Sequence, residues 1–204
     1  ALFPWRTING EEASAHYAAG TAQYHINADI MYALKKYVEI TDDNAMLYNE
    51  GAEMLVETAR FWVDIGFYSD RKSGKFCIHG VTGPDEYTAV VNNNAYTNLM
   101  ARENLLFAVK TVTKMHDQLP AYFETLVDRT KLDFSEVETW QQAADKMYVP
   151  YDRTLGIHPQ DEDFLDLEVW DIKNTPRDRF PLLLFYHPLV ILSLIHISEP
   201  TRPY

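Results

Sequence analysis

Residues 22–65 read AQYHINADIMYALKKYVEITDDNAMLYNEGAEMLVETARFWVDI, and they set the class of fold. Apolar residues recur at spacings of three and four between residues 22 and 39, which predicts one amphipathic helix. These residues are Ile26, Ile30, Leu34, Tyr37 and Val38. The Thr-Asp-Asp sequence at residues 41–43 breaks this pattern and offers side chains that cap a helix start. A second helix is therefore expected from about Asn44 to Ile65, joined to the first by a short turn.

More helices are expected towards the C-terminus. They are predicted at about residues 96–112, 120–131 and 135–147. Three asparagines at residues 92–94 resemble a cap for the first of these helices, and Pro120 suits the first turn of the second. Ser135 and Glu138 form the S-x-x-E capping pattern for the third. After a turn at residues 71–75, only residues 76–78 suggest a strand. Paired helices with so little strand predict an all-α domain.

Helical periodicity fades between Val149 and Phe180, where prolines, a glycine and several acidic residues make a long loop. The acidic residues are Asp161, Glu162, Asp163, Asp166, Glu168 and Asp171. A loop of this length inside a compact domain is often functional. A solvated excursion between helices explains the charge pattern equally well, so both interpretations stay open.

Composition limits the compartment and the partners. The 204 residues suffice for one domain with a buried core. A net charge of −12 without a basic patch argues against nucleic acid as a partner. The single cysteine, Cys77, allows no intrachain disulfide, which fits a reducing compartment, so a cytoplasmic location is expected. The apolar stretch at residues 182–197 is too short and too interrupted to span a bilayer, so no membrane partner is expected.

The segment Gly80–Tyr87, GVTGPDEY, is the strongest candidate for chemistry. It places two carboxylates, Asp85 and Glu86, directly after a Gly-Pro turn and before an aromatic ring. A carboxyl that is partly desolvated on a stiff turn can stay protonated near neutral pH and act as an acid. The alternative is an ordinary surface turn, because Gly, Pro and Asp all favour turns. On spacing alone, the surface turn is the better supported interpretation.

Three longer stretches of sequence favour a catalytic role for this segment over the surface turn. They are residues 79–98 (HGVTGPDEYTAVVNNNAYTN), 2–12 (LFPWRTINGEE) and 20–30 (GTAQYHINADI). In this order they resemble glycoside hydrolase family sixty-five, and within it the maltose phosphorylases. The resemblance covers residues 1–191 and implies a partial (α/α)6 barrel, in which loops at one end of the inner helices form the sugar pocket.

The resemblance further implies that this barrel is truncated at both ends. Residues 1–191 are then a partial catalytic domain, and residues 192–204, which depart from the family pattern, are interpreted as a non-native tail. In the family, Ser and His residues further downstream hold phosphate, and a Lys-Gln pair there binds the donor glucose. We therefore expect this polypeptide alone to be inactive, and a homodimer is a possible state of the full-length protein.

The activity implied by the resemblance is inverting phosphorolysis of a disaccharide. Glu86 matches the family's general acid and would protonate the oxygen of the departing sugar while inorganic phosphate attacks the anomeric carbon. Maltose and phosphate would give glucose and β-glucose 1-phosphate. Phosphate is a co-substrate, and no cofactor is expected.

Five further residues are candidates for binding substrate. Trp5 and Arg6 match a position that lines the donor-sugar pocket, where Trp5 can stack on a sugar ring and Arg6 can bind hydroxyls. Relatives with other specificities often carry an acidic residue in place of Arg6, which favours maltose. His25 and Asp29 share one helical face and can bind sugar hydroxyls or each other. They lack a third ligand, so no metal site is expected. Asp85 either orients a group or forms the turn, with the turn favoured.

Two rival functions stay open. The first is a hydrolase of the same fold, similar to a trehalase, which needs a second carboxylate to activate water. The second is a helical carbohydrate-binding module without catalysis, in which Glu86 has no chemical role.

Overall fold

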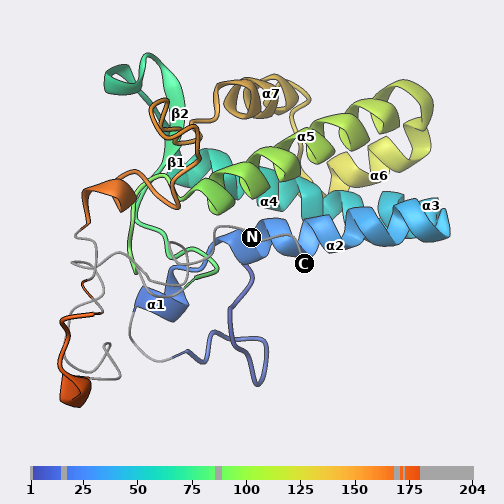
Figure 1. The fold of residues 1–204 in the computed structure, drawn as a ribbon. Coiled ribbons are helices and arrows are strands. Elements are labelled where there is room, and N and C mark those ends of the chain that lie inside the picture. Colours follow the sequence, from blue (N-terminus) through green and yellow to red (C-terminus); the bar gives the residue numbers. More distant parts are fainter. Residues whose placement is uncertain (1, 15–17, 86–88, 168–170, 172, 180–204) are drawn as a thin grey trace.

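The computed structural model of the chain describes residues 2–14, 18–85, 89–167, 171 and 173–179. The helices are α1 (Ala18–Thr21), α2 (His25–Thr41), α3 (Asn44–Met46), α4 (Ala52–Ile65), α5 (Ala95–Gln118), α6 (Pro120–Thr130) and α7 (Glu136–Lys146). The strands β1 (Gly66–Ser69) and β2 (Lys75–Ile78) form a small hairpin (Figure 1). The prediction of an all-α domain is confirmed. In the described part of the chain, no helix is long and apolar enough to cross a membrane.

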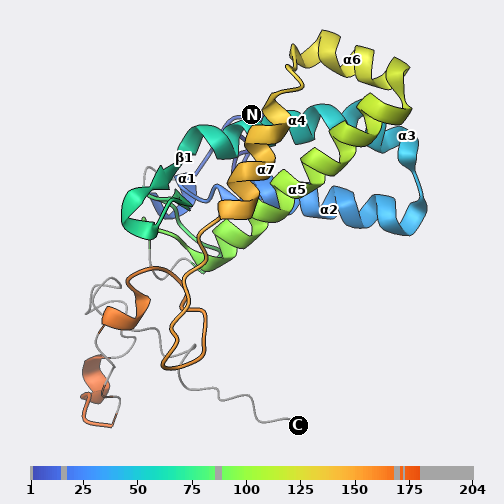
Figure 2. The same cartoon turned by 90° about the horizontal axis from the view of Figure 1, so that it is seen from above.

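Several connecting segments meet at one end of the helical bundle. α2 and α5 begin beside the β-hairpin, whereas α4 and α7 end there (Figures 1 and 2). The segment between β2 and α5 and the loop that follows α7 reach the same end. Residues that are far apart in the sequence therefore meet at this end, as the residues of a functional site commonly do.

The first helical pair follows the sequence prediction closely. α2 covers the expected first helix, and Asp43 caps the second, because its side chain accepts a hydrogen bond of 3.0 Å from the Met46 amide. The second helix has one irregularity, a π-helical turn at Leu47–Gly51 between α3 and α4. A β-carbon on Gly51 would lie 2.8 Å from the Leu34 side chain, so this glycine lets the two helices approach closely.

The centre of the core contains a hydrogen-bonded polar pair as well as apolar side chains. Trp62 on α4 is fully buried, and its indole N–H donates to Asn104 of α5 at 2.9 Å. The Asn104 amide donates in turn to the Thr58 hydroxyl at 3.1 Å. Buried polar groups cost free energy unless they are paired, so these bonds make the polar residues compatible with the core.

The structure confirms helix α5, but this helix does not bury a purely apolar face. Tyr96 is 41% exposed and Leu99 is 43% exposed. The buried positions include small and polar residues, which are Thr97, Asn98, Ala101, Asn104, Ala108 and Thr111, beside Leu105, Val112 and Met115. α5 contacts α2, α4 and α7, and small side chains allow several helices to approach one helix.

Two further details differ from the sequence prediction. β1 was not expected, because its sequence GFYS directly follows a helix and has no turn signal of its own. The cap of α7 lies two residues before the predicted Ser135, whose side chain makes no capping bond. Instead, Asp133 accepts from the Ser135 amide at 2.9 Å, and Glu136 accepts from the Asp133 amide at 3.1 Å. This is a reciprocal capping box built on D-x-x-E.

The long loop after α7 is confirmed within the described residues, where its helical structure is limited to short 3-10 turns at Phe164–Asp166 and Arg177–Arg179. Its acidic residues are not all solvated. Asp161 is only 2% exposed, and burial raises the pKa of its carboxyl. The expected tail, residues 192–204, lies outside the described residues.

Candidate active site

The two candidate carboxylates lie in residues 81–91, called here the Glu86 segment, between β2 and α5. Its two ends pair with each other: the Val81 amide donates to the Val91 carbonyl at 3.0 Å, and the Val91 amide donates back at 2.8 Å. The Thr82 amide donates to the Ala22 carbonyl at 2.9 Å, which ties this segment to the start of α2. Asp85 is half-buried, whereas Glu86 lies outside the described residues. The expected role of Glu86 therefore stays a prediction.

The three asparagines after this segment have separate structural roles. Asn92 accepts a hydrogen bond from the Gly80 amide at 3.2 Å through its side chain. Asn93 is fully buried and adopts a left-handed backbone with φ of 50°, a conformation that Asn tolerates better than most residues. Asn94 caps α5, because its side chain accepts from the Thr97 amide at 3.0 Å. The predicted cap is confirmed, and all three residues hold the backbone that joins the Glu86 segment to α5.

Trp5 and Arg6 lie in a tight turn organised by Glu12. The Glu12 carboxylate accepts hydrogen bonds from the backbone amides of Ser14 at 2.8 Å, Trp5 at 2.7 Å and Arg6 at 3.3 Å. Hydrogen bonds from Ser14, followed by those from Trp5 and Arg6, lower the pKa of Glu12 to about 2. Glu12 is therefore ionised at neutral pH, and its hydrogen bonds hold the backbone of Trp5 and Arg6 in place.

A cavity of about 130 Å³ lies beside this turn. Trp5, Glu12, Gln23 and Tyr24 are among its lining residues. A β-carbon on Gly20 would lie 3.6 Å from the Trp5 ring, so α1 contributes to the same surface. Trp5 is 41% exposed, which leaves an aromatic face available to a sugar. Arg6 is exposed and is not among the lining residues, so in this structure Trp5 and Arg6 are not both on the cavity wall.

His25 and Asp29 contact each other at the start of α2. His25 Nδ1 lies 2.7 Å from Asp29 Oδ2, and His25 Nε2 lies 3.2 Å from Gln23 Oε1. The Tyr96 hydroxyl of α5 donates to Asp29 Oδ1 at 2.9 Å. Burial, followed by the hydrogen bond to Asp29, raises the pKa of Tyr96 to about 12. A continuous polar chain thus runs from the cavity through Gln23 and His25 to α5.

The sequence prediction did not include Gln23 or Tyr96 in this series of polar contacts. Gln23 stands two residues before His25, which is a weak local signal. Tyr96 is 67 residues from Asp29, so only the packing of α5 on α2 brings the two together. Among the residues that the structure describes, no group of three or more His, Cys, Asp or Glu side chains is arranged to hold a metal ion.

A larger cavity of about 480 Å³ lies elsewhere, between the C-terminal half of α2 and α5. Its lining includes Lys35, Lys110 and Lys114 together with Glu39 and Glu103. None of the residues that the sequence predicts for substrate binding lines it. The smaller cavity beside Trp5 is therefore the better candidate for the site, despite its size.

Comparison with known proteins defines the class of the chain. Residues 1–191 match the Glycosyl hydrolase family 65 central catalytic domain, so the chain belongs to this family. This confirms the family that the three sequence runs resemble. A solved structure of a candidate kojibiose phosphorylase from the human microbiome has the same fold, with a TM-score of 0.80 and 29% identity. The matched region covers 93% of this chain and 28% of that protein, which is consistent with a partial (α/α)6 barrel.

Two curated relatives are more similar in sequence. The chain is 54% identical over 200 residues to an alpha,alpha-trehalose phosphorylase of Thermoanaerobacter brockii, covering 98% of this chain and 26% of that protein. It is 51% identical over 191 residues to an alpha,alpha-trehalose phosphorylase of Geobacillus stearothermophilus, covering 94% of this chain and 25% of that protein. The chain thus spans about a quarter of the length of the curated relatives it matches.

Proposed function

We propose that the full-length protein is an inverting disaccharide phosphorylase of glycosyl hydrolase family 65. One observation carries this proposal, which is 54% identity across almost the whole chain to a protein named as a trehalose phosphorylase. Phosphate is the co-substrate, and the reaction needs no cofactor. The chemistry proposed for the site is general-acid assistance to the leaving sugar while phosphate attacks the anomeric carbon from the opposite face.

Glu86 is the proposed general acid. It follows the Gly83-Pro84 turn in a segment whose two ends are paired through Val81 and Val91. Asp85 is proposed to shape the turn. Trp5 is proposed to stack on a sugar ring in the cavity beside it, with His25 and Asp29 orienting polar groups of the same pocket.

The choice of disaccharide needs revision relative to the sequence prediction. The resemblance favoured maltose, partly because Arg6 stands where some relatives carry an acidic residue. The two relatives above 50% identity carry the name of trehalose phosphorylase, which makes trehalose the first substrate to test. Phosphorolysis of the α-linkage with inversion would give glucose and β-glucose 1-phosphate. Maltose and kojibiose are the comparison substrates.

Phosphate dependence is the test of this proposal. The full-length protein should release β-glucose 1-phosphate from trehalose only when inorganic phosphate is present. Release of two glucose molecules without phosphate would favour the hydrolase instead. The Glu86→Gln variant should lose at least about 100-fold in kcat, since general acid catalysis typically contributes that much or more. Unchanged turnover in this variant would contradict the role of Glu86, and binding without turnover in the wild type would favour the carbohydrate-binding module.

The remaining expectations about the whole protein are also proposals. A cytoplasmic location is consistent with the single cysteine, and the net charge of −12 argues against nucleic acid as a partner. A homodimer is proposed for the full-length protein, and a membrane is not a proposed partner. Fractionation of cells and sedimentation of the full-length protein test the location and the homodimer.

A further inference from the structure

The long acidic loop after α7 packs directly against the exit of the Glu86 segment. The Ala95 amide donates to the Gln160 carbonyl at 2.9 Å, and the Glu162 amide donates to the Asn92 carbonyl at 3.1 Å. The Asn94 side chain also donates to the Gln160 carbonyl, at 3.1 Å. Residues 160–162 therefore run along residues 92–95 and form part of the support of that segment.

The Glu162 side chain joins three parts of the chain. Its Oε2 accepts a hydrogen bond of 2.6 Å from Asn93 Nδ2, and its Oε1 forms an ion pair with Lys72. The Lys72 ammonium lies 4.8 Å from the centre of the Tyr148 ring, just after α7. Burial raises the pKa of Glu162, but the hydrogen bonds from Lys72 and Asn93 outweigh it and hold the pKa below its usual value. Glu162 is thus an anion at neutral pH.

Asn93 connects the Glu162 contact to the chain on both sides of the Glu86 segment. Its Oδ1 accepts from the Ile78 amide and from Asn98 Nδ2, each at 3.3 Å, and its own amide donates to the Ile78 carbonyl at 2.8 Å. The Ile78 amide and Asn98 Nδ2 are both donors, so the side-chain oxygen of Asn93 must face them. The Glu162 carboxylate accepts only, so the side-chain NH2 group of Asn93 must face Glu162. The Asn93 amide therefore has one orientation, which Glu162 helps to fix.

We infer that Glu162 is a positioning residue for the general acid, an inference that rests on the proposed function. Ile78 precedes the Glu86 segment and Asn93 follows it, so the bonds through Asn93 set the distance between its two ends. A displacement of about 1 Å at a reacting group can cost about 100-fold in rate. Loss of the Glu162 carboxylate should therefore impair proton donation more than it impairs binding of substrate.

Two substrates with different leaving groups separate this role from a purely structural one. Trehalose needs a proton on the departing oxygen. In α-glucosyl fluoride, a phosphate oxygen bonds to C1 while the C1–F bond breaks with its electron pair. The products are fluoride and β-glucose 1-phosphate, and the leaving group needs little help from an acid. The variants are Glu162→Ala and Glu162→Gln in the full-length protein. Glu103→Gln is the control, because it removes another half-exposed ion pair, to Lys35.

Glu162→Ala should lose about 10- to 100-fold in kcat on trehalose, with KM nearly unchanged, and less than about threefold on the fluoride. Glu162→Gln, which keeps an acceptor for Asn93, should lose less than Glu162→Ala. Glu103→Gln should match the wild type on both substrates. Equal losses on the two substrates, or no loss on either, would overturn the inference.

Hydrogen exchange distinguishes failure of this inference from failure of the proposed function. In Glu162→Ala, the amides of Val81 and Val91 should exchange faster than in the wild type, whatever reaction the protein performs. Unchanged exchange at both amides would overturn the inference even in an active phosphorylase. A wild type that turns over neither substrate in the presence of phosphate would refute the proposed function and, with it, the role of Glu162 in proton donation.

Discussion

Gly83 touches the side chain of Asn94 so closely that a β-carbon on Gly83 would lie 2.5 Å from Asn94 Nδ2. The Asn94 side chain cannot move away freely, because it caps α5 at Thr97 and donates to the Gln160 carbonyl. The turn that precedes Glu86 and the cap of α5 are therefore one packing unit. The glycine of the Gly-Pro turn is required by this contact, in addition to any requirement of the turn.

Gly83→Ala should destabilise the protein by about 1–3 kcal/mol, because the added methyl group displaces a helix cap and its hydrogen bonds. The free energy of unfolding in urea measures this. In an Asn94→Ala background the same substitution should cost at least about 1 kcal/mol less, since the clashing group is gone. Additive losses in the double variant would show that the contact with Asn94 is not the cause.

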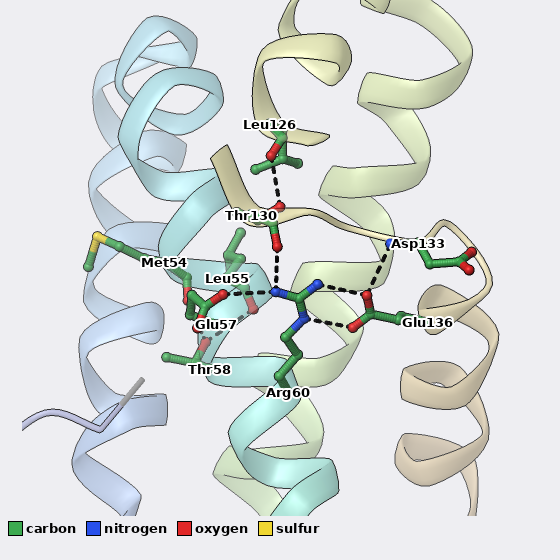
Figure 3. A network of polar contacts seen from close by, with 9 residues as sticks. All are labelled: Met54, Leu55, Glu57, Thr58, Arg60, Leu126, Thr130, Asp133 and Glu136. Carbon is green, nitrogen blue, oxygen red and sulfur yellow. Dashed lines mark hydrogen bonds and ion pairs between the residues drawn. The ribbon is translucent and has the colours of Figure 1, made fainter. Parts of the chain in front are cut away.

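The ion cluster around Arg60 joins α4 to the end of α6 and to the start of α7 (Figure 3). Arg60 Nε and Nη2 each donate to a different oxygen of Glu136 at 2.7 Å, and Nη1 donates to Glu57 and to the Thr130 carbonyl, both at 2.9 Å. The Arg60 guanidinium holds the pKa of Glu136 below its usual value despite partial burial. Arg60→Lys should lose about 1–3 kcal/mol, because an ammonium cannot replace the planar fork.

The same cluster predicts a dependence of stability on pH. A carboxyl whose pKa is lowered by folding stabilises the protein above its unfolded pKa of about 4.3, and this contribution is lost as pH falls through the folded value. Glu136→Gln should therefore be less stable than the wild type at neutral pH and approach it in acid. Urea unfolding at several pH values measures the difference. Glu39→Gln, which removes a more exposed pair with Lys36, should show a much weaker trend, because solvent screens the attraction that lowers the pKa of Glu39.

The capping box of α7 predicts different outcomes for two neighbouring residues. Asp133→Ala should lower the melting temperature by a few degrees, because Asp133 accepts from the Ser135 amide. Ser135→Ala should change it less, since the Ser135 side chain makes no capping bond and its hydroxyl donates only an exposed hydrogen bond of 2.8 Å to Asp133. Thermal unfolding followed by circular dichroism compares the two variants. A larger effect of Ser135→Ala would restore the S-x-x-E box that the sequence suggests.

Trp5 should contribute to binding of the disaccharide. In the full-length protein, Trp5→Ala should raise KM by about tenfold through loss of an aromatic face, while Trp5→Phe should retain part of the affinity. Tyr32→Ala is the control, because Tyr32 is a similarly exposed aromatic on α2 that does not line the cavity. Equal KM values for all three variants and the wild type would exclude Trp5 from the binding surface.

Local sequence signals were sufficient for most of the elements. The spacing of apolar residues predicted α2, α4 and α5, and the caps at Asp43 and Asn94 lie where the sequence placed them. These features depend on residues within a few positions of one another, so a short window of sequence contains their cause. The three runs shared with family 65 also identified the family before any contact was known.

Contacts between distant residues had no such signal. Arg60 and Glu136 are 76 residues apart, and Asn93 and Glu162 are 69 apart, yet each pair is within hydrogen-bonding distance. The buried face of α5 likewise depends on which helices surround it, which is why it includes small and polar residues such as Thr97, Asn98 and Asn104. The sequence alone was enough to establish the helices and the family. The support behind the Glu86 segment exists only in the folded chain, because packing alone brings its parts together.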